Sequence, residues 1–71
     1  MIEITTTRSN MLKMIAYDEA TKILTITFNN GGAYEYYDVP KKIFDELISA
    51  ESEGKCFLAN IKNIYRYAKI P

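Results

Sequence analysis

The residue types best suited to ligand chemistry are concentrated in the last third of the chain. From Gly54 onward, basic and aromatic side chains are interleaved and neither aspartate nor glutamate occurs. The basic residues are Lys55, Lys62, Arg66 and Lys69, and the aromatic residues among them are Phe57, Tyr65 and Tyr67. Lysine and arginine bind phosphates, and aromatic rings stack on unpaired bases. The segment therefore predicts a contact with RNA or a nucleotide, with Lys55, Lys62 and Arg66 on the phosphates.

A purely structural interpretation of the same segment is also open, and it is the simpler one. Basic residues near a helix end favourably oppose the helix dipole, and aromatic rings can serve as core anchors. An acidic cluster just upstream would repel phosphate if it shared that face: Asp45, Glu46, Glu51 and Glu53. The nine basic and nine acidic residues cancel, so no field of the whole protein attracts nucleic acid.

A second candidate is the stretch Tyr34-Glu35-Tyr36-Tyr37. In an extended chain Tyr34 and Tyr36 point to one face, while Glu35 and Tyr37 point to the other. A tyrosine face exposed to solvent could stack bases. It could equally pack across strands or form a dimer interface, where tyrosine is enriched. Packing or dimerisation is the simpler of these interpretations.

Small polar residues at the expected ends of elements complete the candidate set. Ser9, Asn10, Ser52 and Asn60 are of the kind that lines ligand pockets. Capping and turn formation explain each of them more simply. The candidate ligand-binding residues are therefore Lys55, Lys62, Arg66, Tyr34, Tyr36, Ser9 and Asn60.

The sequence lacks the constellation that nucleophilic catalysis requires. Ser9, Ser52 and Cys56 could serve as nucleophiles, but the chain has no histidine to act as their base. A single cysteine forms no intramolecular disulfide, and without histidine the usual zinc ligands are missing. We therefore expect a protein that is not an enzyme and carries no metal or cofactor.

Length and composition indicate one small domain spanning residues 1–71. A chain this short buries only about 60% of its unfolded surface. Six tyrosines and three phenylalanines exceed what such a core can hide, so a homo-oligomer is a further expectation. The chain has no charged-then-apolar leader and no apolar run of about 18 residues, so we expect no membrane contact and a cytoplasmic location.

The elements that position these residues begin with strands. Two-step alternation predicts a meander over residues 12–17, 23–28 and 33–37, preceded by an extended arm or edge strand over residues 1–10. Asp18 suits the first position of a hairpin turn, and Asn29–Gly32 tolerates the positive φ of another. In the first meander strand, Leu12, Met14 and Ala16 would share one face.

Helical spacing replaces the alternation after Pro40, whose fixed φ suits the first helical position. Apolar residues at Ile43, Phe44, Leu47 and Ile48 predict a helix over 41–51. Gly54 is placed to end it in a left-handed conformation. A second helix is predicted over 55–65, and 68–71 is a tail.

Strands followed by helices predict an α+β fold: a three- to four-stranded antiparallel meander followed by two helices packed on one face of the sheet. Leu24, Ile26 and Phe28 would meet the helix stripe of Ile43, Phe44 and Leu47. The other sheet face would carry threonines and some tyrosines.

An ordered series of residues resembles a known family. The series is Tyr17-Asp18, Leu24, Phe28, Gly32, Tyr34-x-Tyr36, Val39-Pro40, Phe44, Leu47, Ala50-x-Ser52-x-Gly54, Phe57, Asn60-Ile61 and Tyr65. It resembles the KTSC domain, named for the C-terminus of some lysyl-tRNA synthetases and also present in small stand-alone bacterial and phage proteins. The similarity spans roughly residues 6–65.

The resemblance implies a domain with no established enzymatic role, for which RNA binding is suggested by its association with a synthetase. This chain has Ser9-Asn10 where the family usually has paired serines, and Lys62 where arginine is frequent. Because lysine is a point charge, Lys62 cannot make the planar bidentate phosphate contact of arginine.

Three functional hypotheses follow. The first is a non-catalytic binding module for RNA or a nucleotide-like phosphate ligand. The second is a self-assembling or protein-binding adaptor whose aromatic residues form the interface. The third is a phage protein that sequesters a nucleotide signal between subunits, although the chain has no phosphate-binding glycine loop.

Overall fold

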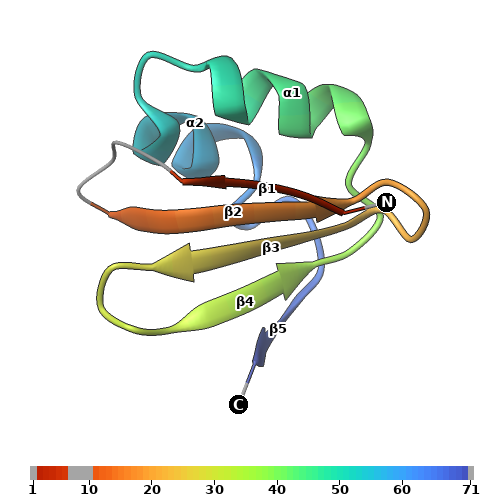
Figure 1. Cartoon of the computed structure of the whole chain (residues 1–71), viewed down its shortest axis with the longest axis horizontal. Coiled ribbons are helices and arrows are strands. Elements are labelled where there is room, and N and C mark those ends of the chain that lie inside the picture. Colours follow the sequence, from red (N-terminus) through yellow and green to blue (C-terminus); the bar gives the residue numbers. More distant parts are fainter. Residues whose placement is uncertain (1, 7–10, 71) are drawn as a thin grey trace.

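The computed structural model describes residues 2–6 and 11–70, which form an antiparallel sheet and two helices (Figure 1). The elements follow in the order β1 (Ile2–Thr6), β2 (Leu12–Asp18), β3 (Ile23–Phe28), β4 (Ala33–Tyr36), α1 (Lys41–Ser49), α2 (Glu53–Asn60) and β5 (Tyr67–Ile70). The strands lie in the order β1-β2-β3-β4-β5, each antiparallel to its neighbour. The predicted α+β fold is confirmed: an antiparallel meander precedes two helices that pack on one face of the sheet.

The two hairpin turns have the geometry that their residues predict. Asp18 accepts hydrogen bonds from Lys22 N at its carbonyl oxygen (2.7 Å) and from Ala20 N at its side chain (3.0 Å). In the β3–β4 turn, Gly31 adopts a φ of 96°, which glycine tolerates without steric cost. These local interactions set the registers Asp18↔Ile23 and Thr27↔Ala33.

A β-bulge in β2 overturns the predicted division of its side chains between the two faces. The register shifts between Leu12, which lies opposite Phe28, and Met14, which lies opposite Thr27. A bulge places one extra residue on one strand and so reverses the alternation beyond it. Leu12 therefore shares the buried face with Ile15 and Tyr17, whereas Met14 is only partly buried.

Both helices differ from their predicted bounds: α1 ends earlier, and α2 both begins and ends earlier. Helix α1 ends at Ser49, before the expected Gly54 terminator. That prediction was wrong: Gly54 lies in the first turn of α2, where it is buried. Ser52 caps α2 by accepting a hydrogen bond from Lys55 N at 3.3 Å, and this cap moves the start of α2 two residues upstream of the prediction. Helix α2 ends at Asn60 rather than at residue 65.

The core joins the sheet to the helices as predicted. Leu24 and Ile26 of β3 form one buried cluster with Phe44 and Leu47 of α1, and Phe28 packs against its edge. The opposite sheet face carries Thr25 and Thr27, as expected, and no helix among the described residues covers it (Figure 1).

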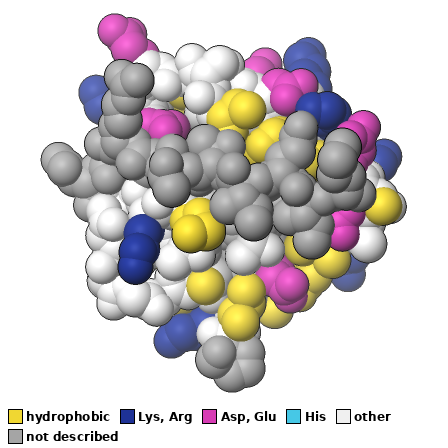
Figure 2. Space-filling view, viewed as in Figure 1, with side chains coloured by type: hydrophobic (Ala, Val, Ile, Leu, Met, Phe, Trp, Pro, Cys, Tyr) yellow, Lys and Arg dark blue, Asp and Glu magenta, His cyan; other side chains and the backbone are white. Residues whose placement is uncertain are grey.

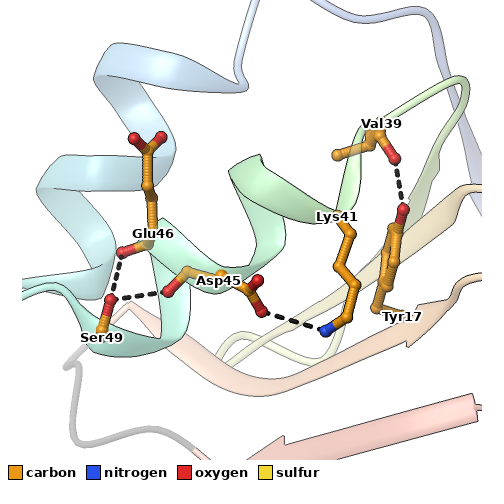
Figure 3. Close-up of polar contacts among 6 residues, drawn as sticks. All are labelled: Tyr17, Val39, Lys41, Asp45, Glu46 and Ser49. Atoms are coloured by element: carbon orange, nitrogen blue, oxygen red, sulfur yellow. Dashed lines mark hydrogen bonds and ion pairs between the residues drawn. The ribbon is translucent and has the colours of Figure 1, made fainter.

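Tyr17 ties the sheet to the segment that enters α1. Its hydroxyl donates to the carbonyl oxygen of Val39 at 2.6 Å (Figure 3), and its ring stacks on Phe44 with centroids 4.9 Å apart. Burial raises the pKa of this hydroxyl, and the nearby Glu19 adds to the effect. The hydroxyl therefore stays protonated and keeps its donor role.

The predicted tail at residues 68–71 was also wrong. Residues Tyr67–Ile70 form β5, which pairs with β4 so that Tyr67 lies opposite Tyr36 and Lys69 lies opposite Tyr34. Four residues carry too weak a periodic signal to be read from sequence, and the pairing with β4 supplies the hydrogen bonds. No helix within the described residues is long and apolar enough to cross a membrane.

Candidate functional site

An aromatic groove of about 280 Å³ lies between the end of α2 and the helix-facing side of β4 and β5. Its aromatic lining comes from four elements: Phe28 of β3, Tyr34 and Tyr36 of β4, Phe57 of α2 and Tyr67 of β5. In the view of Figure 1, both helices lie toward β1 and β2, whereas β5 lies at the opposite end of the sheet. The helix layer therefore stops short of β5, and the aromatic face there stays open.

The rings of the groove contact one another in a continuous series. Phe57 meets Phe28 and Tyr36 at centroid distances of 5.5 Å each, both in edge-to-face geometry. Tyr67 lies 5.8 Å from Tyr34 and 5.6 Å from Tyr36. Such contacts stabilise each pair by about 0.5–1.5 kcal/mol beyond burial. They hold the wall of the groove in one arrangement before any ligand arrives.

Three tyrosine hydroxyls in this groove have no hydrogen-bond partner among residues 11–70. They belong to Tyr34, Tyr36 and Tyr67. Tyr36 is only 4% exposed, yet no fully enclosed side-chain nitrogen or oxygen in this part of the chain lacks a partner. Its hydroxyl must therefore reach the surface inside the groove, where a ligand atom can bond to it.

The environment of Tyr36 keeps its hydroxyl neutral. Burial raises its pKa to about 12, and the neighbouring Tyr67 and Tyr34 add to the effect. A phenol that stays protonated can donate a hydrogen bond at any physiological pH. The groove thus offers a hydrogen-bond donor next to its aromatic wall.

The polar part of the lining comes from Asn30, Lys62 and Asn63, and no carboxylate is among the lining residues. Lys62 is exposed and makes no ion pair within the described residues. The side-chain oxygen of Asn30 accepts from Gly32 N at 3.1 Å, and its amide nitrogen is a hydrogen-bond donor without a partner among residues 11–70. Asn63 follows α2 with a left-handed φ of 66°, a conformation that asparagine tolerates. The polar lining can therefore bind an anion or a carbonyl oxygen.

The structure brings three of the predicted ligand-binding residues together and separates the others. Tyr34, Tyr36 and Lys62 line the groove. Lys55 is exposed on α2 outside it, and Arg66 pairs with Asp38 at 3.2 Å on the surface. Asn60 donates to Cys56 Sγ at 3.4 Å, and Ser9 lies outside the described residues.

Sequence reasoning missed Tyr67 and Asn30 as groove residues. Tyr67 was read as part of a basic segment, because the strand that directs its ring toward Tyr36 was not predicted. Asn30 was read only as a turn residue. The alternation of Tyr67 and Lys69 was the one available signal, and two residues are too few to establish a strand.

Charge is distributed evenly over the surface that can be seen. On the face drawn in Figure 2, basic and acidic side chains are interspersed around the periphery, and neither sign gathers into a patch. Of Lys55, Lys62 and Arg66, only Lys62 is among the residues that line the groove. Attraction of an anion would therefore be local to Lys62 and to Lys69, which lies opposite Tyr34.

The sequence was also compared with the profiles of known protein families. The sequence profile of the KTSC domain matches residues 8–71. This chain belongs to the KTSC domain family. In this KTSC domain the Tyr34-x-Tyr36 pair forms the groove wall, and Tyr17 and Val39 form the hydrogen bond that positions α1.

Similar proteins occur both alone and inside a larger enzyme. A KTSC domain protein from Yersinia pestis, known from a crystal structure, superposes with a TM-score of 0.94 at 30% identity over 100% of both chains. A protein from Tsukamurella paurometabola is 38% identical over 82% of this chain and 87% of its own length. A lysine–tRNA ligase from Nostoc punctiforme is 33% identical over 86% of this chain but only 11% of the ligase.

Proposed function

We propose that this KTSC domain is a non-catalytic module that binds RNA, or a nucleotide-like phosphate ligand, through one unpaired nucleotide in the aromatic groove. The observation that carries the proposal is the nearly buried Tyr36, whose unpartnered hydroxyl opens into a preformed wall of aromatic rings. A planar base satisfies both features, because its face stacks on the rings and its edge carries hydrogen-bonding groups.

The division of roles in the groove follows from exposure. Tyr67 is 56% exposed at the rim and offers its ring to a base. Lys62 is exposed beside it and can bind a phosphate without being desolvated. Stacking on an aromatic ring contributes about 1–3 kcal/mol per base. Since few cations lie near the groove, stacking rather than charge dominates the expected affinity.

The proposal of a non-catalytic role rests on the chemistry of the available side chains. The Ser52 hydroxyl is occupied as the cap of α2, and Cys56 accepts a hydrogen bond from Asn60. The chain contains no histidine to activate either of them. The lysine–tRNA ligase that contains a similar segment acts on tRNA by its name, and this supports RNA as the ligand. We propose the cytoplasm as the location in which this chain meets RNA.

The test is a binding titration of fluorescently labelled RNA by the whole chain. A single-stranded hexanucleotide should bind at low salt, and a duplex of the same composition should bind more weakly because its bases are stacked and paired. For single strands, the logarithm of affinity should fall by about 0.7 per phosphate contact with the logarithm of salt. Absence of binding to any RNA at low salt would refute the proposal.

A second candidate, self-association, is favoured by apolar side chains exposed beyond the groove. Ile64 is 60% exposed next to Tyr67 and Arg66, and tyrosine and arginine are enriched in protein interfaces. Light scattering after size exclusion would show a concentration-dependent mass. A monomer at every concentration would remove this candidate and, with it, sequestration of a nucleotide between subunits.

A further inference from the structure

Strand β5 forms one edge of the sheet, and within residues 2–6 and 11–70 no other strand pairs with its outer side. Tyr67, Ala68 and Lys69 are all exposed. In Figure 1, β5 lies at the end of the sheet away from both helices. An edge strand carries a row of N–H and C=O groups that can pair with a further strand. The outer edge of β5 is therefore a candidate interaction surface.

The pairing of β4 with β5 shows which backbone groups face outward. Tyr37 N donates to the carbonyl oxygen of Arg66 at 2.9 Å, and these two residues continue the register of the strand pair. In an antiparallel pair, hydrogen-bonded and non-hydrogen-bonded residue pairs alternate. Ala68 therefore directs its N–H and C=O groups toward β4, whereas Tyr67 and Lys69 direct theirs away from the sheet.

A second copy of β5 matches these outward groups in one register. When two β5 strands lie antiparallel and are centred on Ala68, Tyr67 of each copy lies opposite Lys69 of the other. Each copy then donates two backbone hydrogen bonds to the other and accepts two. A shift in one direction places Lys69 opposite Lys69 of the second copy and Tyr67 opposite Pro71, which has no N–H group. A shift in the other direction pairs Lys69 with Tyr65, which lies outside the strand.

The side chains fit the same register. Like charges directly opposite each other destabilise a strand pair, and a lysine on an edge strand commonly discourages pairing. In the register centred on Ala68, however, Lys69 lies opposite the Tyr67 ring of the second copy, and a cation is attracted to the face of such a ring. Ala68 lies opposite Ala68, so no bulky side chain separates the strands at the centre.

We propose that two copies of this chain pair through the outer edges of their β5 strands, in the antiparallel register centred on Ala68. The result is a dimer with one continuous sheet. Because the pairing uses the same edge of both copies, association through this edge stops at two chains. The dimer also places Lys69 of the second copy beside Tyr67 at the rim of each aromatic groove.

The experiment removes one outward N–H group without removing a donor to β4. Lys69→Pro lacks this N–H, and Lys69→Ala is the reference, because it loses the same side chain but keeps the donor. Sedimentation equilibrium over a range of concentrations should show a monomer–dimer equilibrium for the native chain and for Lys69→Ala. Lys69→Pro removes two hydrogen bonds from the dimer at about fivefold each, so it should dimerise about 25-fold more weakly than Lys69→Ala.

Amide hydrogen exchange of the native chain, followed by NMR, provides a second measurement. The amides of Tyr67 and Lys69 should exchange more slowly as the protein concentration rises, because they are hydrogen-bonded only in the dimer. The amide of Ala68 is bonded to β4 in the monomer and should be protected at every concentration. An interface made by side chains alone would not produce this alternation.

A native chain that stays monomeric, or equal dimerisation of Lys69→Pro and Lys69→Ala, would overturn the proposal. So would a dimer that Ile64→Ser weakens and Lys69→Pro does not, since this result would place the interface at the exposed Ile64. Circular dichroism checks the fold of each variant, and if Lys69→Pro unfolds, the exchange pattern of the native chain decides. These measurements contain no RNA, so their failure would leave the proposed function intact.

Discussion

Tyr36 and Tyr67 lie directly opposite each other on antiparallel strands, with ring centroids 5.6 Å apart and planes inclined by 36°. The two residues differ sharply in environment: Tyr36 is 4% exposed, whereas Tyr67 is 56% exposed. The pair thus extends the core to the surface, and the exposed ring rests on a buried one. This arrangement gives Tyr67 a fixed position without burying its face.

Substitution of Tyr67 should reduce RNA binding without unfolding the protein. Tyr67→Ala removes the rim ring and should weaken binding of a single-stranded hexanucleotide by about 5- to 150-fold. Tyr67→Phe keeps the ring and should retain most of the affinity. Fluorescence anisotropy measures both, and Tyr37→Ala, which lies next to β4 but outside the groove lining, is the control. Equal losses for Tyr67→Ala and Tyr37→Ala would contradict the assignment of the groove.

Lys62 should account for a measurable part of the salt dependence. Lys62→Ala removes one phosphate contact and should lower the log–log salt slope by about 0.7. Lys42→Ala removes another exposed lysine, on α1, that does not line the groove, and its slope should match that of the native chain. Titrations at several salt concentrations provide the slopes. A native slope in Lys62→Ala would place the phosphate elsewhere.

Loss of the Tyr17 hydroxyl should destabilise the fold. Tyr17→Phe leaves the ring on Phe44 but removes the donor to the Val39 carbonyl, and Val39 is fully buried. A buried acceptor without its partner costs about 1–3 kcal/mol of the free energy of unfolding. Urea denaturation measures the change. Tyr37→Phe, which removes a longer bond of 3.3 Å to Glu35 Oε1, should change stability by less than about 0.5 kcal/mol.

Stability should fall at alkaline pH because of Tyr36. Its pKa in the folded protein is raised to about 12 by burial, with the neighbouring tyrosines adding to the effect, whereas a tyrosine in the unfolded chain titrates near pH 10. The folded state holds the proton more tightly, so the stabilisation is complete below about pH 10 and is lost as the pH rises toward 12.

The expected loss from Tyr36 between pH 10 and 12 is below about 2 kcal/mol in the free energy of unfolding, because solvent in the groove screens the charge of the ionised hydroxyl. Tyr17 acts in the same direction, because its pKa is also raised by burial. Urea denaturation at intervals over this range measures the slope. Tyr36→Phe should flatten it, and an unchanged slope would assign the alkaline loss to other groups.

Local sequence features predicted most of the scaffold. Alternation in β3 and the Asn29–Gly32 turn act between near neighbours, and the helix stripe of Phe44 and Leu47 follows from the period of a single helix. The core contact between β3 and α1 followed from these patterns. They were readable because each depends on residues a few positions apart.

Three features of the fold depended on contacts with a neighbouring segment of the chain rather than on the local sequence. The bulge after Leu12 is defined only by its register with β3. Strand β5 has four residues and is held by β4. Gly54 is compatible with the end of one helix or the start of the next. The Ser52 cap places it in the first turn of α2. Intrinsic preferences are weak where such tertiary contacts compete with them.

The sequence by itself determined that Tyr34 and Tyr36 share one face of a strand, because side chains alternate along an extended backbone. Only the tertiary structure decided that this face looks toward the helices, and that Tyr67, Phe57 and Lys62 meet it there. The physical reason is distance along the chain: pairing of β5 with β4 joins segments separated by the two helices. No local pattern encodes a groove whose walls are brought together by that pairing.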